Sequence, residues 1–139
     1  CKTRSDRKGR NRQMTISVNK VSAYEDGGVS LMARHRGNDG AYITRTSLNS
    51  ISVKVFDKSD PSTTLQSTTL NVSTVVFDTL QTDTRWTKDS TGYNFRHDVP
   101  GSWLESGNKT YRIEYKFDPV AGEDFFLVFE VRTANILGS

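Results

Sequence analysis

The sequence contains a single cysteine, and it is residue 1. One thiol excludes an internal disulfide, and it cannot supply the paired cysteines of the common structural zinc sites. Three interpretations of Cys1 stay open: an arbitrary start of the chain, the acylated first residue of a mature bacterial lipoprotein, or a terminal thiol without a role. The cysteine count therefore excludes a disulfide framework and leaves a lipid anchor as an alternative.

Long apolar runs are also lacking. No stretch approaches the roughly 20 apolar residues that a helix needs to span a bilayer, so we expect no transmembrane segment. Only 34% of the 139 residues are hydrophobic, yet 7 Phe, 5 Tyr and 2 Trp supply bulky core material that a disordered chain would lack. The length and composition predict one folded domain with a polar surface.

Helical periodicity is missing as well, since no segment of ten residues has a convincing 3.6-residue repeat. Strict alternation of apolar and polar residues is present instead, and only a strand sends successive side chains to opposite faces. Turn-forming residues recur every eight to twelve positions, which favours an all-β, antiparallel sandwich of about 7–9 strands, with a small barrel as the alternative. The alternating segments are 14–19, 29–34, 51–56, 93–99, 111–117 and 125–131.

Other segments have weaker signals. The first two alternating segments are expected to pair with each other across the glycines at 27 and 28, and residues 41–44 to form a short edge strand. The Thr- and Ser-rich segment 63–72 predicts an exposed edge strand. Residues 75–77 predict either another strand or one helical turn opened by Ser73, residues 78–90 a loop, and residues 102–104 a turn with Trp103 buried beneath it.

The segment from Lys88 to Phe95 contains the pattern Asp-x-x-Gly-Tyr-x-Phe, and Val-Pro, Gly-x-x-Tyr-x-Ile and an apolar last strand follow it. This series resembles the C-terminal half of bacterial and phage immunoglobulin-like modules over about 45 of the 139 residues. The resemblance implies an immunoglobulin-like sandwich in which Tyr93 hydrogen-bonds back across a corner. The cysteine pair and the strand tryptophan of antibody domains are absent.

His35 and His97 are the only histidines, and neither has Cys, Asp or Glu at metal-ligand spacing. His97 is in phase with Tyr93 and Phe95, so we expect a histidine at the edge of the core that hydrogen-bonds a neighbour. We therefore predict a protein without metal or cofactor that is not an enzyme. A carboxylate pair for glycoside hydrolysis is the enzymatic alternative that the sequence leaves open.

We expect residues 1–12 to form a basic N-terminal arm and residues 13–139 to form a single β-sandwich domain. The arm has a net charge of +5, so the other residues carry −2. No aromatic side chain is available in the arm for base stacking, so we expect it to dock on neighbouring protein subunits, with weak non-specific contact to nucleic acid or an anionic surface left open. The candidate interaction residues are Lys2, Arg4, Arg7, Lys8, Arg10 and Arg12.

The last strand adds two candidate interaction residues. Phe126 and Val128 point away from the face that carries Phe125, Leu127 and Phe129, so both faces of this strand are apolar. The outer face of a simple sandwich is polar. Either another part of the chain covers Phe126 and Val128, or they contact another subunit.

These observations lead to one functional hypothesis and one alternative. The hypothesis is a non-enzymatic structural subunit of a phage virion, such as a capsid-decorating, head-completion or tail protein, whose arm binds neighbouring subunits in a homo- or hetero-oligomer. The alternative is a binding module of the bacterial surface or periplasm, anchored through an acylated Cys1 with its arm on lipid headgroups.

Overall fold

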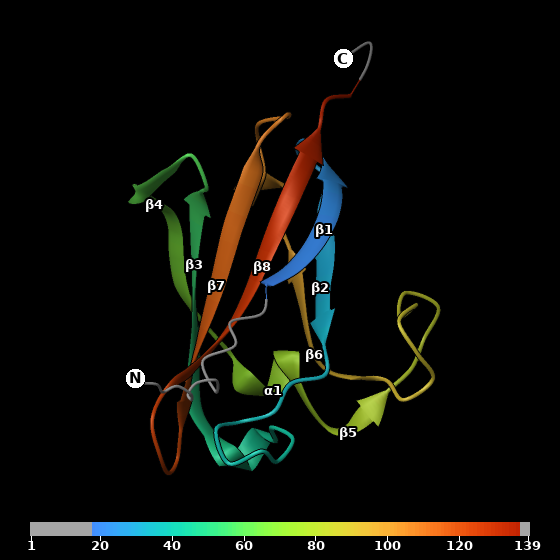
Figure 1. Cartoon of the computed structure of the whole chain (residues 1–139), viewed down its shortest axis with the longest axis vertical. Coiled ribbons are helices and arrows are strands. Elements are labelled where there is room, and N and C mark those ends of the chain that lie inside the picture. The colour runs from blue at the N-terminus through green and yellow to red at the C-terminus, as the bar shows by residue number, and fades with distance from the viewer. Residues whose placement is uncertain (1–17, 137–139) are drawn as a thin grey trace, which may run out of the picture.

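The computed structural model describes residues 18–136, and these residues form two facing β-sheets (Figure 1). One sheet has five strands in the order β1-β8-β7-β3-β4, and the other has three in the order β2-β6-β5. The predicted all-β sandwich is confirmed at this level. The strands are β1 (Val18–Tyr24), β2 (Val29–Ala33), β3 (Leu48–Asp57), β4 (Asp60–Leu70), β5 (Val76–Gln81), β6 (Tyr93–Val99), β7 (Thr110–Pro119) and β8 (Phe125–Ala134).

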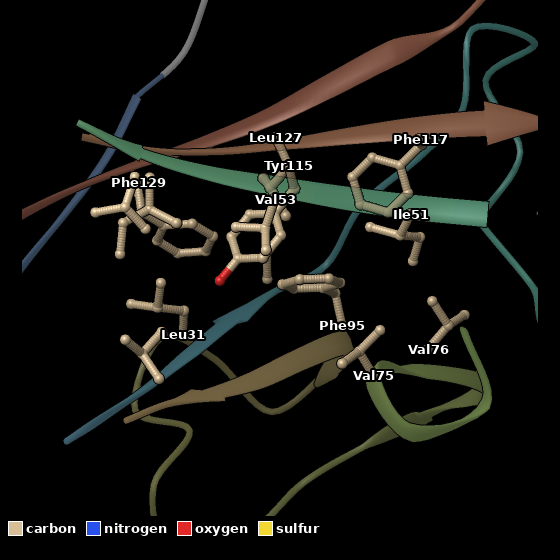
Figure 2. Packing of buried hydrophobic residues seen from close by; sticks show 14 of the residues in the cluster. Leu31, Ile51, Val53, Val75, Val76, Phe95, Tyr115, Phe117, Leu127 and Phe129 are labelled. Atoms are coloured by element: carbon tan, nitrogen blue, oxygen red, sulfur yellow. The ribbon is translucent and has the colours of Figure 1, made fainter. Parts of the chain in front are cut away.

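The core lies between the two sheets, and aromatic rings occupy its centre (Figure 2). Phe95 of β6 is fully buried, and its ring centroid lies 4.9 Å from that of Tyr115 and 5.8 Å from that of Phe117, both on β7. Burial of each such side chain stabilises the fold by roughly 1.5–3 kcal/mol. The aromatic side chains on the inner faces of β6 and β7 thus pack against each other and join the two sheets.

β7 and β8 form an antiparallel hairpin whose register runs from Thr110 opposite Arg132 to Phe117 opposite Phe125. The rings of Phe117 and Phe125 stack in parallel with centroids 5.0 Å apart. The hairpin is therefore held at its turn by an aromatic pair as well as by the ladder.

The expected pairing of the first two strands is wrong. β1 runs parallel to β8, and β2 pairs with β6 in the other sheet, so the sandwich is not wholly antiparallel. The backbone N–H of Glu25 donates to the Ala134 carbonyl at 3.0 Å, and that of Asp26 donates to the Leu104 carbonyl at 2.9 Å. These two bonds hold the turn across the end of the sandwich, so the chain changes sheets there.

The connections differ from the predictions in three further places. Residues 41–44 form no strand, since only an isolated bridge joins Arg36 to Tyr42. Residues 72–81 contain both predicted alternatives, a helical turn α1 (Val72–Val75) and then β5, which extends into the predicted loop. Asn71, rather than Ser73, caps the start of the helical turn, because the Asn71 side chain accepts the Ser73 backbone N–H at 3.1 Å.

Leu104, rather than Trp103, is the fully buried residue at the turn after β6. Trp103 is only partly buried and packs against His97, with ring centroids 5.5 Å apart. The predicted role of Trp103 is thus corrected: the smaller Leu104 side chain fills the interior, and the indole covers the core edge.

Two tyrosines brace the ends of strands. Tyr93, at the start of β6, donates its hydroxyl proton to the Asp83 carboxylate at 2.6 Å. Tyr111, near the start of β7, accepts the backbone N–H of Ser106 at 3.0 Å. The bond from a tyrosine hydroxyl back to upstream backbone is therefore made by Tyr111, while Tyr93 bonds to a side chain.

Between Val18 and Ile136 no helix has the length and apolar character that crossing a membrane requires.

Candidate interaction surface

The turn between β7 and β8 and the segment before β3 enclose an open cleft of about 720 Å³ at one end of the sandwich. Both walls lie at the lower end of the molecule in Figure 1. The walls are mostly apolar, with Asp39 and Glu123 as their acidic residues. The main apolar lining residues are Tyr42, Ile43, Leu48, Pro119, Val120 and Phe125.

Hydrogen bonds tie the two walls of the cleft together. The Asn38 side-chain amide donates to the Glu123 carbonyl at 3.0 Å, and the Val120 backbone N–H donates to the Ser47 carbonyl at 3.0 Å. The Arg36 guanidinium lies 4.0 Å from the Tyr42 ring centroid, which orients that ring through a cation–π contact. The cleft is thus built on a braced part of the fold.

Two large apolar side chains at this end face solvent. Val120 on the turn is 61% exposed, and Phe126 on β8 is 56% exposed. Phe126 lies opposite Lys116 in the β7–β8 ladder, and Lys116 forms an ion pair with Asp124 at 3.4 Å. We use the name apolar end for the cleft, Val120 on its wall and Phe126 on the outer face of β8 next to the cleft-lining Phe125.

The two residues predicted to share the outer face of β8 differ in exposure. Phe126 is exposed, whereas Val128 is only 7% exposed. Val128 lies opposite Val18 of β1, and its carbonyl accepts the Asn19 side-chain amide at 3.2 Å. Val128 is therefore covered within the chain, which was one of the two alternatives, and Phe126 is the residue of this pair that presents a surface. Contact with a partner stays a prediction for both.

The arm residues Lys2, Arg4, Arg7, Lys8, Arg10 and Arg12, and the first part of the strand predicted at 14–19, lie outside the described residues. Their role stays a prediction.

His97 makes the hydrogen bond that its position predicted. Its Nδ1 lies 2.7 Å from the Tyr115 hydroxyl, and its pKa is lowered, chiefly by burial. Burial raises the pKa of Tyr115. Both groups are therefore held in their neutral forms near pH 7, in a hydrogen bond that links the two sheets.

His35 lies behind the apolar end, with its ring centroid 5.1 Å from that of Phe117 and 5.6 Å from that of Phe125. Its Nε2 is buried without a hydrogen-bond partner among residues 18–136, and burial lowers its pKa to about 4. The Asn94 side chain fixes its backbone, accepting the His35 N–H at 2.7 Å and donating to the His35 carbonyl at 3.0 Å.

Two carboxylates organise the loop between β5 and β6. Hydrogen bonds from the Tyr93 hydroxyl and then the Arg85 backbone lower the pKa of Asp83 to about 2. Asp89 accepts from the Trp86 indole at 3.0 Å and from Arg34 at 2.9 Å, and the Trp86 bond is the largest cause of its lowered pKa. These acids are stabilised in the ionised form and hold the loop to the start of β6.

No group of three or more His, Cys, Asp or Glu side chains within the described part of the chain is arranged to hold a metal ion.

Sequence reasoning found Phe126 but missed the cleft and Val120. The cleft depends on how residues 37–48 pack against a turn about 80 positions later in the chain. The only local signal was an apolar Val120 in a turn whose other residues are small or polar.

Comparison of the chain with protein-family models, with curated proteins and with solved structures finds no match in any of the three.

Proposed function

We propose that this chain is a non-enzymatic structural subunit of a larger assembly, a phage virion component of the capsid-decorating, head-completion or tail type. The observation that carries the proposal is the apolar end, where Val120 on the wall of an apolar cleft and Phe126 on the adjoining outer face of β8 each expose more than half of their surface. Aromatic side chains are enriched in protein interfaces, and a few of them supply most of the binding energy.

The proposal includes an immunoglobulin-like topology, which the strand order supports. In such sandwiches one sheet holds strands C, F and G with an added strand beside C, and the other holds strands B, E and D. Here β3, β7 and β8 take the places of C, F and G, β4 lies beside β3, and β2, β6 and β5 form the opposite sheet. The bond from Ser106 N–H to the Tyr111 hydroxyl has the position of a tyrosine corner at the start of strand F.

This topology relates the apolar end to the loops that immunoglobulin-like domains use for binding. The connections β2–β3 and β7–β8 correspond to the B–C and F–G loops, which variable domains use for recognition. Both connections line the cleft. We infer that neighbouring subunits bind at this end, and that the basic arm of residues 1–12 adds a second, charge-based contact.

Incorporation into particles tests the proposal. Phe126→Asp introduces a charge into the proposed interface, and loss of a central aromatic anchor typically costs at least about 2 kcal/mol of binding, or about a thirtyfold loss of affinity. We therefore expect particles assembled in the presence of this variant to contain far less of it than of wild type. Deletion of residues 1–12 should also reduce incorporation while leaving the fold intact.

Tyr24→Asp is the matched control, because Tyr24 is 64% exposed but lies on β1, opposite Ala134 at the other end of β8. Incorporation of Phe126→Asp equal to that of Tyr24→Asp would refute the role of the apolar end. The lipoprotein alternative predicts acyl chains on Cys1, which mass spectrometry of the native chain detects.

A further inference from the structure

The edge strand β4 is exposed along nearly its whole length. Every residue from Asp60 to Thr69 is exposed, and only Leu70 is partly buried. Its side chains after Asp60 are uncharged, and no charged residue follows until Asp78. β4 is thus a long, neutral strand with both faces in solvent.

The outer edge of β4 has no neighbour among residues 18–136. The strand ends the five-stranded sheet and pairs only with β3. From Gln66 to Leu70 the register with β3 is unbroken, and the irregularities lie nearer the β3–β4 turn. Because alternate residues of a strand direct their backbone N–H and C=O groups to each side, this segment presents a straight row of donors and acceptors.

Two of the other edge strands, β1 and β5, carry features that discourage pairing, and the third, β2, has only five residues. β1 has Lys20 in its middle, and β5 has only two paired positions with β6. Natural proteins blunt free edges with charges, prolines, bulges or short length. The segment 66–70 has none of these, since Pro61 and the bulge lie before it.

We propose that β4 pairs antiparallel with β4 of a second copy of this chain, about a two-fold axis, so that two five-stranded sheets join into one. This proposal goes beyond the proposed function, because it names a partner and a contact on an edge away from the apolar end.

The charge and composition of β4 favour a second copy over other occupants. An identical neutral strand brings no like charges together, and Thr and Ser side chains form favourable cross-strand pairs with one another. The basic arm of a neighbour has no matching carboxylate on β4 beyond Asp60. A two-fold contact is also self-complementary, so a single strand satisfies both sides of it.

A charge-swap experiment on the purified full-length chain tests this pairing. Ser67 and Thr69 lie on either side of Thr68, the middle residue of the unbroken segment 66–70, and both are exposed. We expect the wild type to dimerise in sedimentation equilibrium. Ser67→Lys/Thr69→Lys and Ser67→Glu/Thr69→Glu should each weaken dimerisation by about tenfold or more, because residue 67 of one copy faces residue 69 of the other in a pair centred on Thr68 and like charges then lie opposite each other. An equimolar mixture of the two variants should form a heterodimer.

Thr84→Lys/Thr87→Lys is the matched control, since both threonines are exposed in the loop between β5 and β6. This variant should dimerise like wild type. In addition, amide exchange of the wild type should show protection of outward-facing N–H groups in residues 66–70 that grows with protein concentration, a readout that needs no variant.

A wild type that stays monomeric at every concentration would overturn the proposal, as would Lys variants that dimerise like wild type or a mixture that does not associate. The experiment uses no particle, so a negative result would refute the β4 pairing without bearing on the proposed role of Phe126 in incorporation. Failure of that test likewise leaves the β4 pairing untouched.

Discussion

His35 makes the fold sensitive to mild acid. Its ring is packed against Phe117 and Phe125, and its buried Nε2 has no hydrogen-bond partner in the described structure to stabilise a proton. Burial lowers the pKa of His35 from 6.5 to about 4. The folded state therefore resists protonation, whereas the unfolded chain accepts a proton as soon as the pH falls below 6.5.

The sign and size of the effect follow from this difference. Well above pH 6.5 His35 is neutral in both the folded and the unfolded state, so it does not change the free energy of unfolding with pH. As the pH falls from 6.5 towards 4 the unfolded state binds more protons, so the free energy of unfolding decreases. Integration to pH 4.5 gives a loss of up to about 2.5 kcal/mol. Unfolded carboxylates, with ordinary pKa values of about 3.9 for Asp and 4.3 for Glu, also bind some protons at that pH, so the contribution of His35 has to be isolated by comparison with a variant that keeps every carboxylate.

Urea unfolding of wild type and His35→Phe, each at pH 7 and at pH 4.5, measures this contribution. Phe removes the titrating group and keeps an aromatic ring between Phe117 and Phe125. Wild type should lose about 2.5 kcal/mol more than the variant between the two pH values. Any packing cost of the larger ring cancels, because each protein is compared with itself. His97 is present in both proteins and also cancels. Equal losses in the two proteins would refute the reasoning.

Two further predictions concern the room for a side chain at two glycines and the hydrogen bond between His97 and Tyr115 that links the two sheets. At Gly92, with φ of +106°, an added Cβ would lie 2.4 Å from the Gln81 carbonyl oxygen, whereas Gly122, with φ of +95°, has open space around it. Gly92→Ala should therefore lower the free energy of unfolding by about 1–3 kcal/mol more than Gly122→Ala, as measured by chemical denaturation; equal costs would show that the backbone relaxes freely. Tyr115→Phe removes the hydroxyl that bonds His97 Nδ1, and thermal unfolding should show a loss of about 1–2 kcal/mol, while an unchanged stability would mean that the bond contributes nothing net.

Local alternation was enough to predict the strands that form the centre of the sandwich. β3 and β7 bury alternate residues, so their inner faces could be read from the sequence. Alternation also predicted inner-face residues of β6 and β8 that are buried, such as Phe95 and Phe129, although neighbouring residues of these two strands are buried as well. The exposure of β4 was also predictable, because a run of Thr and Ser offers little to bury.

Pairing between distant strands could not be read in the same way. The parallel partner of β1 is set by hydrogen bonds at its turn, and no pattern within residues 18–24 encodes them. The same limit explains why the sequence did not predict different exposures for Phe126 and Val128. Both lie on the outer face of β8, and Val128 is covered because β1 lies beside it. The cleft likewise required two loops from remote parts of the sequence.

The parallel pairing of β1 with β8 has a mechanical consequence. The first and last described strands lie side by side over seven paired positions, from Val18 opposite Val128 to Tyr24 opposite Ala134. Because the strands are parallel, tension applied to the chain before β1 and after β8 pulls them along their length in opposite directions. The hydrogen bonds between them are then loaded in shear and share the force, instead of opening one after another. A subunit held in an assembly by its ends would resist stretching through this pair of strands.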